Sequence, residues 1–401
     1  MGESYRSLFE RIHCERHAYF GTWIHSMPMT VSPARDEELR ELGRVLYACA
    51  HHYVKHYREW LDLIPYDDDV LETLEYSERY PFRAGTWRPD ILLCADGSVR
   101  VCEITSRFFG NGYFFSYFYD EAAVRKCKAA GVTSYTTRME EMLAYFAQMA
   151  EGYERLVLVK SADRSDSIRL YVPFYDALGL KVSIFEHDEV QKNLHELEGA
   201  FVVSALNQHD LASFLPTTRH LMADVGMRND FRTIYLLHDK RFFRLFFEDA
   251  FVRECLSEQE TAFLRAHVVQ TFLPGADPEA FEQARRNKDG FILKHRCLGK
   301  SEKVYAGPLC TEDQWEGLFA SDVLPHMILQ PFMDQRTFAI TWQGTAFDDY
   351  ACGSILTVDD RYFGPSLVRT SSCPVMNQGD DRKFAPIVTD QAERLGAHYE
   401  M

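Results

Sequence analysis

The sequence lacks the patterns that mark several common classes of protein. Its ten cysteines include no C-x-x-C pair, which disfavours a zinc site, and most stand among apolar residues. We expect them to be reduced packing residues of a cytoplasmic protein. No apolar run reaches the length of a bilayer span, and the N-terminus, MGESYRSLFERIHCERH, has no apolar core region. We therefore expect neither a membrane partner nor secretion.

Familiar nucleotide-binding and hydrolase motifs are also missing. The sequence has no G-x-G-x-x-G, so a dinucleotide site is disfavoured. It has no G-x-S-x-G and no local cysteine signature, which disfavours a serine or cysteine hydrolase. The run Gly299-Lys300-Ser301 lacks the first glycine and the following helix of a P-loop. Any nucleotide site must therefore be built from other combinations of residues.

Basic residues are fewer than acidic ones. The 44 lysines and arginines against 60 aspartates and glutamates give a net charge of -16. A field of this sign disfavours nucleic acid or an anionic membrane as a partner and tolerates a cationic or zwitterionic small substrate. With 401 residues, of which 46% are hydrophobic, the chain is long enough for one large core or a few smaller ones.

A hairpin is the clearest local feature of the sequence. The apolar runs Ile91–Cys94 and Val99–Cys102 flank Ala95-Asp96-Gly97-Ser98, and Asp-Gly between two β-prone runs is a strong turn signal. If the two strands pair across this turn, Asp90 and Glu103 lie opposite one another. Two opposed carboxylates repel unless a cation lies between them, so the pair is a candidate metal site.

Two further polar residues accompany these acids. Arg88 and Thr105 lie two residues farther out on their strands and therefore on the same faces as Asp90 and Glu103. The alternative is an ordinary ion pair between Arg88 and one of the acids at the end of a strand.

A second candidate region runs from Phe291 to Gly307. Its sequence, FILKHRCLGKSEKVYAG, predicts a buried strand that ends in Lys294, a short loop with Gly299, and a second strand from about Val304. A strand lysine beside a glycine-containing loop with further cations is one way to cover a triphosphate. The alternative is a plain charged hairpin tip.

Other segments complete the pattern. HMILQPF, residues 326–332, predicts an apolar strand that is able to present backbone groups to a flat heterocycle, or else an ordinary core strand. Ser32-Pro33 opens a helix with apolar residues at three- and four-residue spacing. Residues 155–206 alternate strand, helix and strand, which is typical of a parallel α/β layer.

Taken in order, these passages resemble the circularly permuted ATP-grasp ligase family, most closely the synthetase domain of glutathionylspermidine synthase and related small amino-acid ligases. Arg88-Pro89-Asp90 and Glu103-Ile104-Thr105 stand where that family has Arg-x-Asp and Glu-x-Asn, whose acids hold magnesium. Thr105 replaces the asparagine. The resemblance implies Asp90, Glu103 and Thr105 as metal ligands, with Mg²⁺ and ATP as cofactors.

The resemblance also implies roles for other residues. It assigns catalysis to Arg88, Lys294 and Arg369. It assigns ATP binding to two lysines, to the loop Gly299–Lys303 and to an adenine linker, with the residues Lys240, Lys294, Gly299, Lys300, Ser301, Gln330, Pro331, Phe332 and Met333. Arg107 and Asn111 follow the acid motif directly and are candidates for binding the substrate carboxylate, with a structural role for Arg107 equally open.

The expected fold is therefore α/β (α+β), with a circularly permuted ATP-grasp nucleotide domain, a Rossmann-like substrate domain and an N-terminal helical segment. The expected divisions are a largely helical segment over 1–84, the metal-binding hairpin and Rossmann-like domain over 85–235, the lysine, loop and adenine-linker region over 236–390, and a tail over 391–401.

The function that follows is an ATP-dependent carboxylate-amine ligase. Phosphorylation turns a carboxylate into an acyl phosphate, which an amine then attacks to give an amide or peptide bond. A phosphotransferase acting on a hydroxyl group and a catalytically degenerate nucleotide-binding module are the alternatives. The sequence leaves open the identity of the acid and amine and the oligomeric state.

Overall fold

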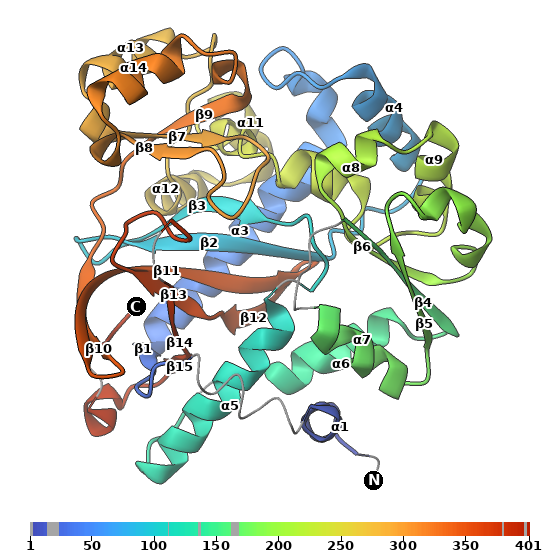
Figure 1. Ribbon diagram of the computed structural model, residues 1–401, viewed down its shortest axis with the longest axis horizontal. Coiled ribbons are helices and arrows are strands. Elements are labelled where there is room, and N and C mark those ends of the chain that lie inside the picture. Colours follow the sequence, from blue (N-terminus) through green and yellow to red (C-terminus); the bar gives the residue numbers. More distant parts are fainter. Residues whose placement is uncertain are drawn as a thin grey trace.

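The computed structural model describes residues 3–13, 24–110, 112–134, 138–161, 168–378, 381–396 and 399–401. A large antiparallel sheet crosses the middle of the molecule (Figure 1). Its central path is β14-β13-β11-β2-β3, and β10 and β12 also pair with β11. The strands are β2 (Thr86–Leu93), β3 (Val99–Thr105), β10 (Thr337–Trp342), β11 (Thr345–Val358), β12 (Arg361–Pro365), β13 (Val368–Ser371) and β14 (Arg382–Phe384).

The predicted hairpin is confirmed as β2 and β3, and its register places Asp90 opposite Glu103. Nearer the turn, however, Ile91 pairs with Val101, so Cys102 is one extra residue on β3. Such a bulge shifts the alternation of side chains by one position. Val101 and Ile104 consequently both face the core, while Cys102 and Glu103 both face the other side of the sheet.

Helix α3 (Pro33–His56) begins where the sequence predicted, and it covers the core face of the sheet. Ser32 caps it by accepting a hydrogen bond from the backbone N–H of Arg35, and proline occupies the first turn. Gly43 allows a close approach, because a Cβ there would lie 3.4 Å from the methyl group of Thr357 on β11. The apolar residues on the buried face of the helix are Leu39, Leu42, Leu46, Cys49 and Tyr53.

The remaining described part of the N-terminal region is largely helical, as predicted, and adds one short strand. Its helices are α1 (Tyr5–Ile12) and α4 (Asp68–Ser77). Strand β1 (Met29–Val31) pairs in parallel with β15 (Pro386–Val388) near the C-terminus. This pairing connects the two ends of the chain.

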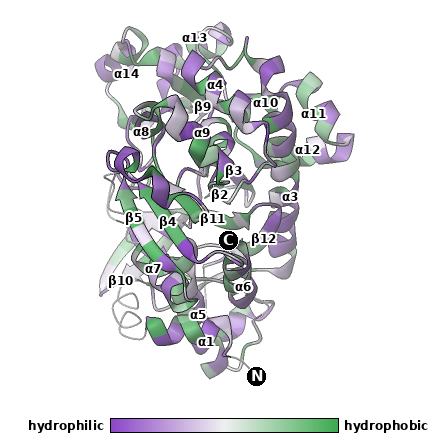
Figure 2. Cartoon of the chain, turned by 90° about the vertical axis from the view of Figure 1, so that its right-hand side faces the viewer, coloured by the Kyte–Doolittle hydropathy of each residue, from purple (hydrophilic) through white to green (hydrophobic). Residues whose placement is uncertain are grey.

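A second sheet is parallel, with the order β5-β4-β6. The predicted strand-helix-strand alternation is confirmed as β4 (Arg155–Lys160), α7 (Ile168–Ala177), β5 (Lys181–Glu186) and β6 (Phe201–Ala205). Strand β4 is drawn mostly in green in Figure 2, because its four central residues are apolar and buried. Helices α5 (Tyr113–Ala129) and α6 (Met139–Met149) share a second apolar core with this sheet.

The third sheet is antiparallel, with the order β8-β7-β9, and lies above the large sheet in Figure 1. Its strands are β7 (Phe291–His295), β8 (Val304–Ala306) and β9 (Met327–Pro331), which confirms the predicted strands around Lys294 and Gln330. Helices α13 (Pro278–Arg286) and α14 (Glu312–Phe319) pack on it. The connecting helices are α8 (Gln208–Ala212), α9 (Pro216–Asp224), α10 (Phe242–Leu245), α11 (Asp249–Cys255) and α12 (Glu258–His267).

The fold is thus of the mixed α/β (α+β) class. The large sheet draws β2 and β3 from the predicted 85–235 segment and β10 to β14 from the predicted 236–390 segment. The domain boundaries themselves stay predictions. Within the described ranges, no helix is both long and apolar enough to cross a membrane.

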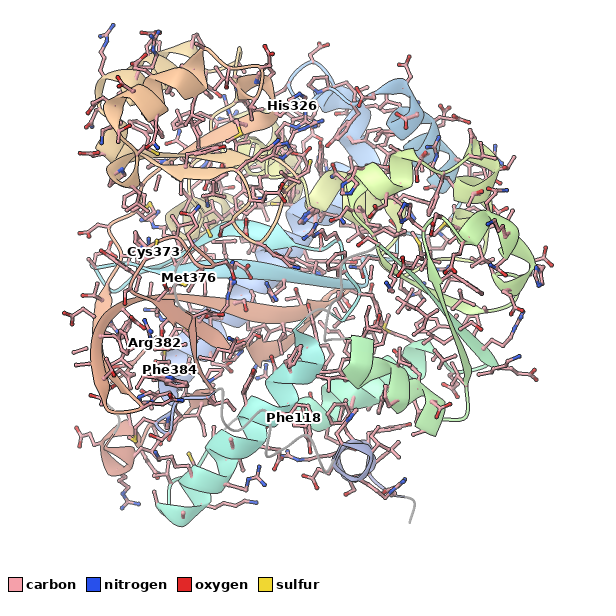
Figure 3. All side chains as sticks on the ribbon, in the orientation of Figure 1. Phe118, His326, Cys373, Met376, Arg382 and Phe384 are labelled. Atoms are coloured by element: carbon pink, nitrogen blue, oxygen red, sulfur yellow. The ribbon has the colours of Figure 1, made fainter. Side chains whose placement is uncertain are left out.

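A buried ion pair joins β14 to β11. Nε and Nη2 of Arg382 each donate to Asp349, at 2.6 Å, and the two side chains are 4% and 0% exposed. Ser372 donates to the same carboxylate at 3.1 Å. Figure 3 shows Arg382 and Phe384 on β14, with Cys373 and Met376 in the connection from β13.

We predict that Asp349→Asn lowers the free energy of unfolding by roughly 3 kcal/mol, because it leaves the buried Arg382 charge without its counter-charge. Glu316→Gln is the matched control, since it breaks a pair with Arg285 in which both side chains are about half exposed. We expect that change to be under about 1 kcal/mol. Urea titration of both variants measures the difference, and similar small effects would contradict the role given to Asp349.

Candidate functional site

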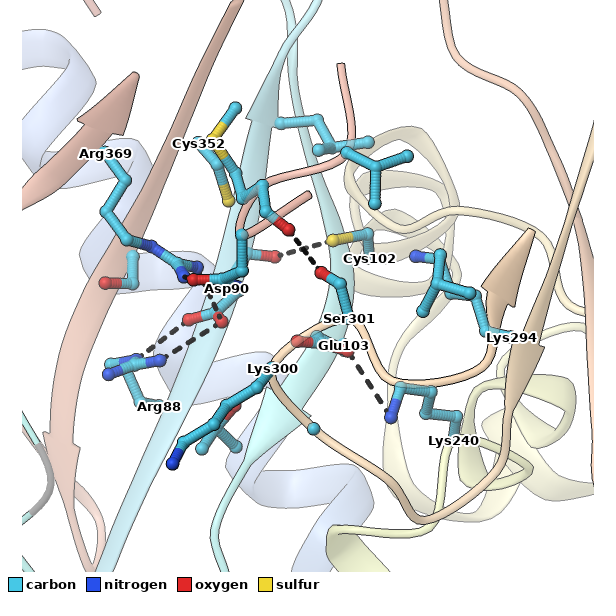
Figure 4. A pocket seen from close by; sticks show the side chains of 18 of the residues that line it. Arg88, Asp90, Cys102, Glu103, Lys240, Lys294, Lys300, Ser301, Cys352 and Arg369 are labelled. Carbon is cyan, nitrogen blue, oxygen red and sulfur yellow. Dashed lines mark hydrogen bonds and ion pairs between the residues drawn. The ribbon is translucent and has the colours of Figure 1, made fainter. Parts of the chain in front are cut away.

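A cavity of about 440 Å³ lies between the outer face of the large sheet and the antiparallel sheet β8-β7-β9. This volume is typical of small-molecule sites. Strands β2, β3, β11 and β13 supply one wall, and β7, β9 and the loop after β7 supply the other (Figure 4).

The structure brings the predicted site residues together in this one cavity. They are Arg88, Asp90, Glu103, Thr105, Arg107, Lys240, Lys294, Gly299, Lys300, Ser301, Gln330, Pro331, Phe332, Met333 and Arg369. Asn111 lies outside the described residues. The role of each of these residues stays a prediction.

Asp90 is held by arginine. Nε and Nη2 of Arg88 donate to its two carboxylate oxygens at 2.8 and 3.2 Å, and Nη2 of Arg369 lies 3.6 Å from Oδ2. Asp90 is almost fully buried. The ion pair considered as an alternative from the sequence is therefore present, and it lies inside the cavity, where Asp90 also faces Glu103.

Glu103 faces lysine. Its Oε2 lies 3.4 Å from Nζ of Lys240, and Figure 4 shows Lys294 on the same side of the cavity. Burial by itself raises the pKa of Glu103, but the ammonium groups of Lys240 and Lys294 outweigh it and hold that pKa well below its usual range. Glu103 is therefore a carboxylate at neutral pH.

Lys294 differs from Lys240 in its contacts within the protein. Its side chain is 8% exposed and lines the cavity. Among the described residues, its ammonium has no hydrogen-bond or ion-pair partner within contact distance, whereas Nζ of Lys240 also donates to the carbonyl oxygen of Leu298 at 2.7 Å. Lys294 therefore acts on Glu103 only through its charge, whereas Lys240 also makes direct contacts.

The cavity carries a large excess of positive charge. Its lining includes seven basic residues, Arg88, Arg107, Lys240, Lys294, Lys300, Arg369 and Lys383, and two acidic residues, Asp90 and Glu103. Burial, together with the neighbouring cations Lys240 and Arg107, lowers the pKa of His238 to about 3, so this imidazole adds no charge. Basic side chains thus outnumber acidic ones in the lining, although the chain has a net charge of -16 and Lys383 is paired with Asp381 at 2.9 Å.

Buried contacts hold the loop between β7 and β8 over the cavity. The two ring nitrogens of His238 lie 3.2 and 3.1 Å from the carbonyl oxygens of Ile104 and Cys297, so the imidazole connects β3 with the loop. The hydroxyl of Ser301 donates to the carbonyl oxygen of Met376, on the opposite rim. The loop therefore bridges the opening.

The loop backbone is strained. Lys300, Ser301 and Lys303 have φ values of 55°, 59° and 49°, in the left-handed region that residues with a side chain rarely adopt. Strain of this kind persists where surrounding contacts enforce it and is common in segments that clamp ligands.

Arg107 and Gln330 make contacts within the protein, in keeping with the structural roles that the sequence left open for them. Arg107 donates to Oδ1 of Asn207, and its guanidinium lies 4.5 Å from the ring centre of Phe108. Nε2 of Gln330 donates to Oγ1 of Thr271 at 2.9 Å, and this hydrogen bond holds β9 against the segment that follows α12. These contacts position the walls of the cavity, and they leave Pro331, Phe332 and Met333 of the predicted linker as lining residues.

The sequence did not predict four lining residues of the large sheet: Leu92, Cys352, Ser354 and Lys383. Asp90 is opposite Ser354 on β11, and Leu92 is opposite Cys352, which in turn is opposite Arg369 on β13. Lys383 on β14 follows in the same row. Alternation along β11 would have identified the inward residues of that strand, but its pairing with β2 links positions some 260 residues apart, which local patterns do not reveal.

The acid pair fits magnesium only in combination with a ligand. The described part of the chain contains no group of three or more histidine, cysteine or acidic side chains placed to hold a metal ion. Magnesium in nucleotide sites is commonly bound through one or two carboxylates together with substrate phosphates. Asp90 and Glu103 match that donor set, and Thr105 lies beside them on β3.

Comparison with known proteins corrects the family expected from the sequence. Residues 51–236, slightly less than half of the chain, match the family described as AnkG N-terminal domain. No curated protein matches the chain. The prediction of a circularly permuted ATP-grasp family is therefore wrong. It rested on short groups of charged residues, such as Arg88-Pro89-Asp90, and groups of this kind occur in proteins of unrelated fold.

Lys294→Met provides a test of the unpartnered ammonium. We predict that the free energy of unfolding stays within about 1 kcal/mol of wild type, because no hydrogen bond or ion pair at contact distance is lost. The rise in melting temperature caused by Mg-ATP should disappear.

Lys240→Met is the matched comparison, since it removes a lysine that has partners. Loss of its contacts with Glu103 and Leu298 should lower the free energy of unfolding by roughly 1–3 kcal/mol even without ligand. Thermal melts of both variants with and without Mg-ATP distinguish the two lysines. A Lys294 variant that unfolds easily yet responds normally to Mg-ATP would make Lys294 a structural residue.

The strained loop generates a second test. We predict that hydrogen exchange across residues 296–304 is fast in the free protein and slows several-fold with Mg-ATP, because bound phosphate offsets the repulsion between its cations. Helices α13 and α14 serve as the internal reference. Equal protection of the loop with and without Mg-ATP would support the plain hairpin tip.

Proposed function

We propose that this protein is an ATP-dependent carboxylate-amine ligase that works with magnesium and an acyl-phosphate intermediate. In this proposal an amino acid or small peptide supplies the carboxylate, and an amine completes the amide or peptide bond. The observation that supports it best is the cavity itself: an excess of five positive charges around two opposed carboxylates, in a strongly acidic protein. A nucleoside triphosphate with a divalent cation has the complementary charge pattern.

The roles of the residues follow from charge and position. Magnesium, when bound, screens the phosphates that the incoming carboxylate must approach. Asp90 and Glu103 supply oxygen ligands for it, and Lys240 and Lys294 stabilise charge on the transferred phosphoryl group. Arg88 and Arg369, which hold Asp90, orient that carboxylate and lie next to the reacting groups.

The loop and the linker complete the proposed site. Gly299 brings the backbone close to Arg107, since a Cβ at Gly299 would lie 2.9 Å from that guanidinium. In this proposal the segment 299–301, which lines the cavity, covers the phosphates, and Pro331 to Met333 border the adenine. Exclusion of water by the closed loop would protect an acyl phosphate from hydrolysis.

A second candidate is a module that binds nucleotide without turning it over. Both acids already have basic partners in the protein, Arg88 and Arg369 for Asp90 and Lys240 for Glu103. If these pairs do not open, no carboxylate oxygen is released for magnesium.

Transfer to a hydroxyl group is the third candidate. The cytoplasmic location expected from the cysteines stays a prediction.

Hydroxylamine trapping separates these functions. The protein is incubated with Mg-ATP, hydroxylamine and mixtures of amino acids and polyamines, and both ADP and hydroxamate are measured. A ligase releases ADP and forms a hydroxamate, a hydroxyl phosphotransferase releases ADP alone, and a binding module releases neither. The last two results would each overturn the proposed ligase.

Glu103→Gln should abolish ADP release while the fold is kept. Replacing the carboxylate by an amide removes one charged ligand from the divalent-cation site, and we expect a loss of at least about 100-fold in turnover. Glu279→Gln, an exposed acid on α13 outside the cavity lining, is the control. Near-normal turnover of Glu103→Gln in saturating Mg²⁺ would return Glu103 to a structural role.

A further inference from the structure

Two thiols outside the cavity lie against each other. The sulfur atoms of Cys49 on α3 and Cys255 on α11 are 3.8 Å apart, although the residues are 206 positions apart in the sequence. Cys49 is fully buried, and Cys255 is partly exposed. A reagent from solution can therefore reach one member of the pair directly and the other only through its partner.

The local structure allows the small movement that a bond between them requires. A disulfide brings its sulfur atoms to about 2.05 Å, so this pair must close by less than about 2 Å. Cys49 lies in the middle of the 24-residue helix α3 and is held by the core. Cys255 is the last residue of α11, and Leu256 after it is extended, so the adjustment falls on the end of a helix.

We propose that Cys49 and Cys255 form a redox-sensitive thiol pair, which a low-molecular-weight disulfide such as oxidised glutathione converts to a protein disulfide that locks α11 onto α3. The Cys255 thiolate attacks one sulfur of oxidised glutathione, whose S–S bond breaks and releases one glutathione. Cys49 then loses its proton and attacks the Cys255 sulfur, which releases the second glutathione. The protein gives up two electrons and two protons, and one oxidised glutathione becomes two reduced molecules.

The environment of the two thiols favours this order of events. The hydrogen bond with Cys49 lowers the pKa of the Cys255 thiol, and burial raises the pKa of Cys49. Cys255 thus has both the access and the thiolate character of the attacking group, and Cys49 is placed to resolve the mixed disulfide.

The cross-link would lie beside a cluster of aromatic rings that supports the segment with Lys240. Phe251, one turn before Cys255, meets the rings of His52 and Tyr53 on α3. Tyr53 stacks on Phe242 at 5.1 Å, and Phe242 follows Lys240 by two positions. Fixing α11 on α3 therefore stiffens the layer from which Lys240 projects into the cavity.

The test treats the intact protein with oxidised glutathione, blocks remaining thiols with N-ethylmaleimide, and maps the peptides by mass spectrometry. We expect a Cys49–Cys255 disulfide that forms in the folded protein and is reversed by dithiothreitol. The melting temperature of the oxidised form should rise by about 5 °C, because the bond closes a very long loop.

Single variants separate the two thiols. Cys49→Ser should stop at a stable glutathione adduct on Cys255, and Cys255→Ser should leave Cys49 unmodified until the protein unfolds. Cys310→Ser, which removes another partly exposed thiol, should leave the oxidation unchanged. Wild-type protein that accumulates the same stable glutathione adduct on Cys255, or that keeps both thiols free while Cys310 is modified, would overturn the proposal without any variant.

Discussion

The site depends on one extra residue in strand β3. The bulge at Cys102 reverses the alternation of side chains, so that Val101 faces the core while Glu103 faces the cavity two positions later. In a regular strand those two residues would point to the same side. Without the bulge, a carboxylate would be buried against α3 in an apolar layer, which is strongly unfavourable. The bulge thus both relieves the core of a charge and places Glu103 opposite Asp90.

Electrostatics explains why the acids and bases of the cavity are stable together. Each of the two carboxylates has a basic partner, and the charge of Lys294 also acts on Glu103. The acids are needed even in the free protein, because they separate cations that would otherwise repel at short range. The acidic and basic side chains of the cavity are thus held in place by contacts with one another.

The sequence predicted what is local and could not predict what is distant. The Asp-Gly turn, the strand with Lys294 and each single strand after Arg155 were predicted because the pattern of each is complete within about ten residues. The bulge at Cys102 leaves no signature of its own, and the pairing of β11 with β2 joins segments far apart in the chain. The family was assigned wrongly for a related reason. A few charged residues at short spacing report the chemistry of a site but carry little information about the fold around it.

The match to the family ends between two groups of residues that line the cavity. Residues 51–236 include the hairpin with Asp90 and Glu103, whereas His238, Lys240 and Lys294 all come later in the chain. The acids and the lysines therefore belong to different segments, and buried contacts bring them together: the His238 ring lies between a carbonyl of β3 and a carbonyl of the loop. The pKa of Glu103, which lies in the matched segment, is lowered by the ammonium groups of Lys240 and Lys294, which lie after it. The cavity is thus a single electrostatic unit, which neither segment can form alone.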